Sequence, residues 1–441
     1  MTPRRFRLGL GLIALGALGA RLYYALHVMG DHRFAGDAIE FHFLAQTLAD
    51  THSYLQPFPL YDPGTLVPRQ NHLEPFLTGH AHISTAEKPP LYPAYLALWI
   101  KLGLSSFRWN MVASSLLGVG TVATVGLIGR RAAGARVGLV AAAVAALYPG
   151  LVLLDGSVRS ESLYVLLVAL SVLAAYRLVE RPSPWRAAVL GLALGAAALT
   201  RAEAVVLLAV LAAPAVWLVR GPRRERLRLL VAVLAGCAVL VLPWLARNWI
   251  VFDRPTPIST NQGGLLAGAN CDRAYHGPLM GAWGCFPQPP ASWGRNESVI
   301  SGRLQSKALT YAGDHAGRLP AVAGVRLLRT WELWKPEESV QFEAVIGDRN
   351  VRFNRIAQRC LYVLALLAVA GAVVLRRRGR PLRLLLALPI LVSLVSVASY
   401  GSTRFRAAAE VAIVVLAAVA LDVVGAQTAA WAAERRARSR H

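Results

Sequence analysis

Long apolar blocks separated by short polar segments recur along the chain, and no other feature limits its fold as strongly. Hydrophobic residues make up 55% of the 441 residues, and each block runs for about 16–22 residues. A helix needs about 20 residues to cross a hydrocarbon core of roughly 30 Å. The pattern therefore predicts an all-α polytopic membrane protein and argues against a soluble domain with a single core.

Ten of the blocks are expected to cross the membrane. The block at 91–104 is excluded because about 14 residues are too few to cross, so an interfacial helix is expected there. Segment 318–335 has the pattern of a basic amphipathic helix lying on the membrane surface. The N-terminal block resembles a signal peptide, but its long apolar part favours an uncleaved first span. The predicted spans cover residues 8–28, 109–129, 137–154, 161–179, 185–200, 203–219, 227–246, 357–375, 382–399 and 407–426.

Positive charge is concentrated between the apolar blocks. The formal net charge is +23, and the chain has 43 arginines but only 4 lysines. Basic chains often bind nucleic acid, but these arginines form short clusters between blocks, as the positive-inside rule expects of cytoplasmic loops. Six such segments hold 23 arginines and three acids: the N-terminus, 130–136, 177–186, 220–228, 376–383 and the tail. The distribution predicts a multi-pass protein of the cytoplasmic (inner) membrane, with both termini inside, membrane lipids as partners and no nucleic acid.

The spans divide the chain into three parts. Residues 1–246 form an N-terminal transmembrane module that includes a first outer loop at 29–108. Residues 247–356 form a second outer loop, and 357–441 form the last helices and a basic cytoplasmic tail.

Two cysteines, Cys271 and Cys285, lie together in the second outer loop. The oxidising outer side favours a disulfide between them. Closing a loop of about 14 residues would contribute roughly 3 kcal/mol. We expect a compact loop over the site that serves as an acceptor-binding lid.

Ionisable residues gather at the predicted outer ends of the spans. Such groups are costly at a membrane boundary unless they pair, snorkel or take part in chemistry. Their one-sided placement indicates a site at the outer boundary, with acids for proton transfer and bases for an anionic head group. The residues are Asp37, Glu40, Glu87, Lys88, Asp155, Arg159, Glu161, Arg201, Glu203, Arg404, Arg406 and Glu410.

Several short motifs in this order resemble those of a known family. They are "GDAIEFHFLAQTLA" (36–49), "AEKPPLYPAYLALW" (86–99), "ALYPGLVLLDGSVRSESLYVLL" (146–167), "GAAALTRAEAVVLL" (195–208) and "YGSTRFRAAAEVAIVVLAAVAL" (400–421). Together they resemble the GT-C fold membrane glycosyltransferases that use polyprenyl-phosphate sugars. Among these, the protein O-mannosyltransferases and the aminoarabinose transferase of lipid A are the most similar. The second outer loop matches only loosely.

The resemblance implies roles for five residues. The acid after the first span is the general base of that family, which here is Asp37. The family's neighbouring acid is replaced by alanine, and the next acid is Glu40, so the base is either of the two. The "EKP" element makes Glu87 a pocket residue, with a metal ion in some relatives, and makes Lys88 the contact of the lipid phosphate. An acid at the outer end of the third span corresponds to Glu161.

The chemistry of such a donor agrees with these residue types. A polyprenyl phosphate is already a fair leaving group, so the site must stabilise its charge and supply a base for the acceptor hydroxyl. Lys88, Arg404 and Arg406 could meet the phosphate. The sequence therefore predicts an inverting glycosyltransferase with an outward-facing site, acting on a glycan, lipid or protein acceptor.

Simpler interpretations stay open for each residue. Arg404 and Arg406 could snorkel to lipid phosphates, Glu161 could cap its helix, and Arg201 could pair locally with Glu203 instead of joining the pocket. Glu87 and Lys88 could form an interfacial ion pair that anchors a helix.

A divalent metal is the one cofactor that the sequence suggests, through the pattern His80-x-His82 near Glu87. Histidines in exposed loops are common, and this spacing is unspecific. Two other functions remain as alternatives, a non-enzymatic translocase of lipid-linked sugars and a structural partner of a cell-envelope complex.

Overall fold

The computed structural model describes residues 1–438 except 31, 33 and 58–82. Within these residues the chain is helical, and its only β pairing is an isolated bridge between Leu55 and Ser84. The all-α prediction is therefore confirmed for the described part of the chain.

Six helices are long and apolar enough to cross a membrane by length and composition. A seventh span results if α6 (Ala135–Leu147) and α7 (Pro149–Asp155), which meet at a bend of 57°, count as one. The bend follows from Pro149, because the residue before a proline avoids the helical conformation and Tyr148 is extended. The six are α1 (Pro3–Tyr23, continued by a turn to Val28), α5 (Phe107–Ala133), α8 (Glu161–Glu180), α11 (Arg223–Phe252), α17 (Val351–Arg377) and α19 (Thr403–Arg438).

Three further apolar helices occupy the remaining predicted spans. They are α9 (Pro184–Thr200), the broken helix Ala202–Leu218 that ends in α10 (Ala213–Leu218), and α18 (Arg383–Ala398). Each of the ten predicted spans thus corresponds to a helix or a helix pair. By length and composition, however, only six or seven of these, within the described residues, are able to cross a membrane. The α9–α11 contact is close because Gly191 faces the Val233 carbonyl, which a Cβ at that position would meet at 2.0 Å.

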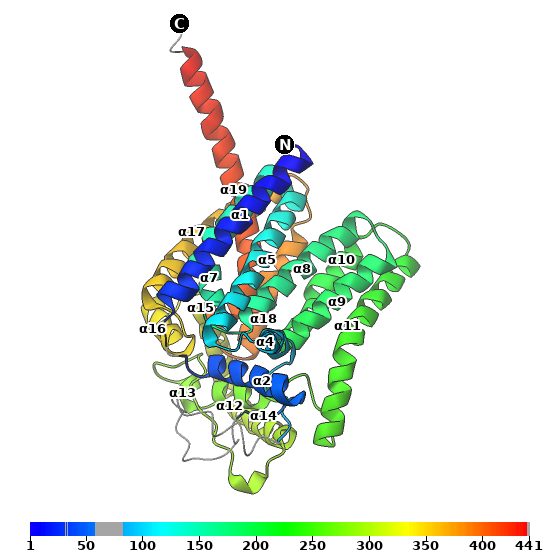
Figure 1. Cartoon of the computed structure of the whole chain (residues 1–441), viewed down its shortest axis with the longest axis vertical. Coiled ribbons are helices and arrows are strands. Elements are labelled where there is room, and N and C mark those ends of the chain that lie inside the picture. The colour runs from blue at the N-terminus through cyan, green and yellow to red at the C-terminus, as the bar shows by residue number, and fades with distance from the viewer. Residues whose placement is uncertain (31, 33, 58–82, 439–441) are drawn as a thin grey trace.

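The polar part of the chain collects at one end of the helix bundle, and both termini lie at the other (Figure 1). Leu91–Lys101 forms α4, whose 11 residues span only about 16 Å, so it cannot cross a bilayer. A disulfide joins Cys271 to Cys285, as the sequence predicts. The other helices of this outer lobe are α2 (Asp37–Thr51), α12 (Gln262–Ala269), α13 (Asp272–Tyr275), α14 (Glu297–Asp314), α15 (Leu319–Thr330) and α16 (Pro336–Ile346).

The structure corrects the expectation for segment 318–335. Its helix α15 does not present its arginines to lipid head groups, because two of them are buried in the protein. Arg326 donates to the Ala269 carbonyl at 2.7 Å, and Arg329 donates to the Met280 carbonyl at 2.6 Å. The helix therefore fastens the disulfide-containing loop to the bundle.

Candidate active site

The first turn of α2 places two acids on one side of the helix. Asp37 is the first helical residue, after Gly36 with its positive φ of 53°. Glu40 follows three positions later, so the two carboxylates are neighbours on the helix surface. The helix that carries them, α2, packs beside α4 (Figure 1).

Lys88 lies between these acids. Its Nζ is 3.1 Å from Asp37 Oδ1, 3.0 Å from Glu40 Oε2 and 3.9 Å from Glu87 Oε1. The lysine is buried, with 7% of its surface exposed. Three carboxyl groups from two segments therefore surround one ammonium group.

The second carboxylate oxygen of Asp37 meets two guanidinium groups. Arg404, from the start of α19, donates to Asp37 Oδ2 at 2.6 Å, and Arg159 donates to the same atom at 3.2 Å. Residues 37 and 404 are thus joined directly although most of the chain separates them. At Asp37, the segment before α4, the turn between α7 and α8 and the start of α19 meet.

Glu161 extends this network. Its Oε1 accepts from Arg404 at 2.5 Å and from Arg201 at 2.8 Å, and Arg201 also contacts Glu203 at 2.5 Å. Glu161 is buried at the first position of α8. We call the connected set the outer charge cluster: Asp37, Glu40, Glu87, Lys88, Arg159, Glu161, Arg201 and Arg404.

Arg406 is not part of the outer charge cluster, contrary to the expectation that it contacts the donor phosphate. It donates to Glu332 at 2.7 Å and to Glu410 at 3.2 Å, and it is buried. Positions 404 and 406 on a helix are about 200° apart around its axis, so the two arginines face opposite sides of α19. Arg406 instead holds the end of α15 against α19.

Two acids of the segment 247–356 bond to residues in or next to the cluster. The sequence analysis did not identify either of them. Asp348 accepts from Arg159 at 3.0 Å and from the Ala35 amide at 3.0 Å, which fixes the chain just before α2. Glu297 accepts from the Ala86 amide at 2.9 Å, next to Glu87 and Lys88. Both residues lie where the resemblance is loose, so no motif pointed to them.

The segment that carries Lys88 is tied down at several atoms. Glu297 also accepts from Thr260 at 2.8 Å and bonds Gln56. The Tyr54 hydroxyl donates to the Lys88 carbonyl at 3.0 Å. These bonds position the backbone around Lys88 before any ligand arrives.

Asp37 and Glu40, the two acids of α2 in the cluster, have pKa values that are shifted in opposite directions. Burial would raise the pKa of Asp37, but Lys88, Arg404 and Arg159 hold it well below its usual range. Burial, together with the Glu87 charge, raises the pKa of Glu40 to about 8, although Lys88 opposes this. The acids around Lys88 raise the pKa of that lysine despite its burial. These shifts favour an ionised Asp37, a protonated Glu40 and a charged Lys88 at neutral pH.

Among the described residues, no group of three or more His, Cys, Asp or Glu side chains is arranged to hold a metal ion. The suggested partners of Glu87, His80 and His82, lie outside the described residues.

Residues 87–247 match the family model described as dolichyl-phosphate-mannose-protein mannosyltransferase. The structure matches the oligosaccharyltransferase of Archaeoglobus fulgidus in its apo form, with a TM-score of 0.58 and 14% identity over 99% of this chain. The chain has the GT-C fold. It spans about half the length of that protein, since the match covers 52% of the archaeal chain.

The oligosaccharyltransferase AglB of Archaeoglobus fulgidus, solved with an inhibitory peptide and a dolichol-phosphate, matches with a TM-score of 0.55, 13% identity and coverage of 98% and 52% of the two chains. ArnT from Cupriavidus metallidurans, solved with undecaprenyl phosphate, matches less well, with a TM-score of 0.37, 12% identity and coverage of 95% and 78%. No curated protein matches the sequence. The expected resemblance to GT-C proteins is therefore confirmed for the fold, and the family model matches residues 87–247.

Proposed function

We propose that this GT-C protein is an inverting glycosyltransferase that moves a sugar from a polyprenyl-phosphate donor to an acceptor hydroxyl. The observation that carries the proposal is the outer charge cluster, in which Lys88 and Arg404 both contact the carboxylate of Asp37. Two cations that share one acid beside an apolar helix bundle suit a lipid phosphate, and the shared acid suits a proton acceptor.

The donor phosphate would bind to Lys88 and Arg404. Arginine offers a planar pair of donors to phosphate oxygens, and lysine offers a compact charge. Both stabilise the phosphate monoester as the bond between it and the sugar C1 breaks. The prenyl chain would leave the cluster along the apolar helices.

Asp37 would take the proton of the acceptor hydroxyl as the oxygen attacks C1. Without a donor, three cations hold the pKa of Asp37 low, which makes it a weak base. A bound phosphate shares Lys88 and Arg404, weakens their hold on Asp37 and so increases its basicity. The base is therefore activated by donor binding, and a single displacement at C1 inverts the anomeric configuration.

The arrangement of the lobes supports a proposal for the side of the membrane and for the route by which the acceptor enters. The second outer loop covers the cluster through Glu297 and Asp348, which favours an acceptor that enters beneath this lobe. The arginine-rich segments lie toward the other end of the bundle, so the positive-inside rule favours an extracytoplasmic site in the cytoplasmic membrane. The acceptor would be the hydroxyl of a glycan, a lipid or a protein.

The proposal is tested with the purified full-length protein in phospholipid nanodiscs, supplied with a radiolabelled polyprenyl-phosphate sugar and envelope extract as acceptor. Asp37→Asn should lower transfer at least about 100-fold, the low end expected for loss of a general base. Asp50→Asn removes an exposed carboxylate from the same helix and should leave transfer unchanged. Full activity of Asp37→Asn would exclude Asp37 as the base.

The translocase alternative would require charges along a path through the membrane. Arg21 is the main charge inside the predicted spans, and it is buried against Asp155 at 2.7 Å. Its guanidinium also donates to the carbonyls of Ala145 and Ala146. These contacts indicate that Arg21 holds α1 against α6 and α7 and does not carry charge along a transport path. Uptake of labelled lipid into sealed vesicles without sugar transfer would favour the translocase.

A further inference from the structure

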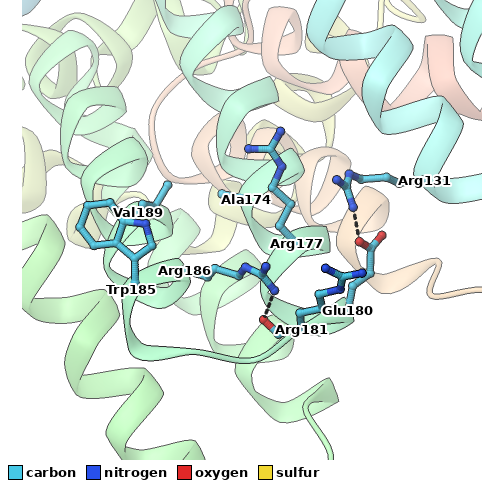
Figure 2. A pocket seen from close by; sticks show the side chains of 8 residues that line it. All are labelled: Arg131, Ala174, Arg177, Glu180, Arg181, Trp185, Arg186 and Val189. Carbon is cyan, nitrogen blue, oxygen red and sulfur yellow. Dashed lines mark hydrogen bonds and ion pairs between the residues drawn. The ribbon is translucent and has the colours of Figure 1, made fainter. Parts of the chain in front are cut away.

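A second site lies where α8 ends and α9 begins. A hollow of about 570 Å³ opens there, within the range of small-ligand sites. Figure 2 shows four guanidinium groups around this hollow, with Trp185 and Val189 on one side of it. We call it the arginine pocket, and its main residues are Arg131, Arg177, Glu180, Arg181, Trp185 and Arg186.

The arginine pocket and the outer charge cluster lie at opposite ends of one helix hairpin. Helix α8 begins at Glu161 in the cluster and ends after 20 residues at Glu180 in the pocket. That length corresponds to about 30 Å, the thickness of a hydrocarbon core. Helix α9 returns from Pro184 toward Arg201 in the cluster. The pocket therefore lies at the membrane boundary opposite the proposed active site.

The pocket carries excess positive charge. Glu180 is its one acid, and this acid pairs with Arg131. Arg186 donates to the backbone carbonyl of Arg181 at 2.5 Å, an uncharged partner. The guanidinium groups of Arg177 and Arg181 contact no partner within the part of the chain that the structure describes. Arg177, Arg181 and Arg186 thus leave three unbalanced positive charges around one hollow. These charges repel each other, and a bound anion would relieve the repulsion.

The wall of the pocket is partly apolar. Trp185 is 72% exposed, and tryptophan at a membrane boundary lies at the level of the lipid head groups. Ala174 and Val189 complete the lining. The ligand should therefore combine a phosphate, which guanidinium groups bind bidentately, with an apolar part beside it.

We propose that the arginine pocket binds the phosphate of an anionic lipid head group in the leaflet opposite the active site. Basic pockets between membrane helices are suited to such head groups. Inorganic phosphate shares this chemistry but lacks the acyl chains that would lie along α8 and α9. The lipid would fix one end of the hairpin whose other end carries Glu161 and Arg201. This site goes beyond glycosyl transfer and does not depend on it.

The test uses the full-length protein, delipidated in detergent and titrated with dioleoylphosphatidylglycerol while native mass spectrometry counts bound lipid. The double variant Arg177→Gln/Arg181→Gln should bind this lipid at least about tenfold more weakly, because it removes two of the charges that attract the anionic head group. The control, Arg223→Gln/Arg224→Gln, removes the same charge from the exposed start of α11, outside the pocket. It should bind as the wild type does.

Two further measurements separate the sources of the anion. Dioleoylphosphatidylcholine should bind equally weakly to all three proteins, and millimolar inorganic phosphate should not displace bound phosphatidylglycerol. Displacement by inorganic phosphate would assign the pocket to a free anion and overturn the lipid proposal. An equal loss of binding in both double variants, or unchanged binding in Arg177→Gln/Arg181→Gln, would also overturn it.

Discussion

Asp37 owes its properties to contacts that a linear motif cannot show. Its carboxylate meets Lys88, Arg159 and Arg404, which come from three distant parts of the chain. The motifs pointed to Lys88 and Arg404 because charges at span ends are conspicuous in apolar surroundings. They also pointed to Arg406, which lies outside the cluster because a shift of two positions turns a helical side chain to the opposite face.

The acidity of Glu40 gives a pH-dependent prediction. Above a pH of about 8, Glu40 ionises and adds its negative charge to those of Asp37 and Glu87 beside Lys88, where it competes with the donor phosphate. The KM for donor should therefore rise in the wild type as the pH passes 8, and it should stay flat in Glu40→Gln. Transfer assays between pH 6 and 9.5 measure this. If Glu40→Gln is instead inactive at every pH, Glu40 is the base and Asp37 is not.

The same carboxyl makes a prediction about stability. The folded protein keeps a proton on Glu40 up to a pKa of about 8, whereas its ordinary pKa is 4.5. Between these values the folded state binds more protons than the unfolded state, so the contribution of Glu40 to the free energy of unfolding falls as pH rises. Glu40→Gln should therefore flatten the pH dependence of the thermal midpoint above pH 5. An unchanged slope would contradict the raised pKa.

At the scale of elements, α14 positions the segment that carries Lys88. Glu297 is the first residue of α14 and bonds the Ala86 amide, Thr260 and Gln56. Glu297→Ala should lower kcat/KM for the donor about tenfold or more, since small misplacements of a catalytic group are costly. It should also destabilise the fold by about 1–3 kcal/mol, because buried donors lose their acceptor. Transfer kinetics and thermal unfolding of the same preparation measure both effects.

A matched control separates positioning from stability. Asp314→Ala removes an exposed acid from the last position of α14 and should change neither quantity. Glu297→Gln keeps one acceptor oxygen and should recover part of the lost kcat/KM. If Glu297→Ala lowers stability but leaves kcat/KM unchanged, Glu297 only fastens the lobe.

The helices could be predicted from the sequence better than the outer lobe could. Apolar blocks fix where a helix runs, so the ends of α8 and α9 lie within one residue of their predicted positions. Glu297 and Asp348 could not be recognised because their partners, Ala86 and Arg159, are about 190 or more residues away. A charged residue in a long polar loop carries no local sign of the contact that it makes across the fold.

At the scale of the whole molecule, the two charged regions distinguish one end of the helix bundle from the other. Acids and bases in balance surround the proposed active site at one end, and unbalanced arginines surround the arginine pocket at the other. The balanced charges suit the binding of a lipid-linked donor. The unbalanced arginines suit the cytoplasmic side under the positive-inside rule. Both termini lie at the end away from the outer lobe (Figure 1), which agrees with an even number of crossings.

The orientation of the protein in the membrane can be measured by labelling cysteines that replace two glycines, one at each end of the bundle. A Cβ at Gly302 in α14, or at Gly425 in α19, would meet nothing within 4 Å, and both positions are exposed. Gly425 follows the start of α19 by 22 residues, or about 33 Å, so it lies past the opposite boundary.

In intact spheroplasts, a membrane-impermeant maleimide should label Gly302→Cys at once and Gly425→Cys only after permeabilisation. The wild type is the control, since its free thiols are Cys237 and Cys360 within α11 and α17. The reverse labelling pattern would place the outer charge cluster in the cytoplasm and contradict an extracytoplasmic transferase, while leaving the lipid proposal for the arginine pocket open to its own test.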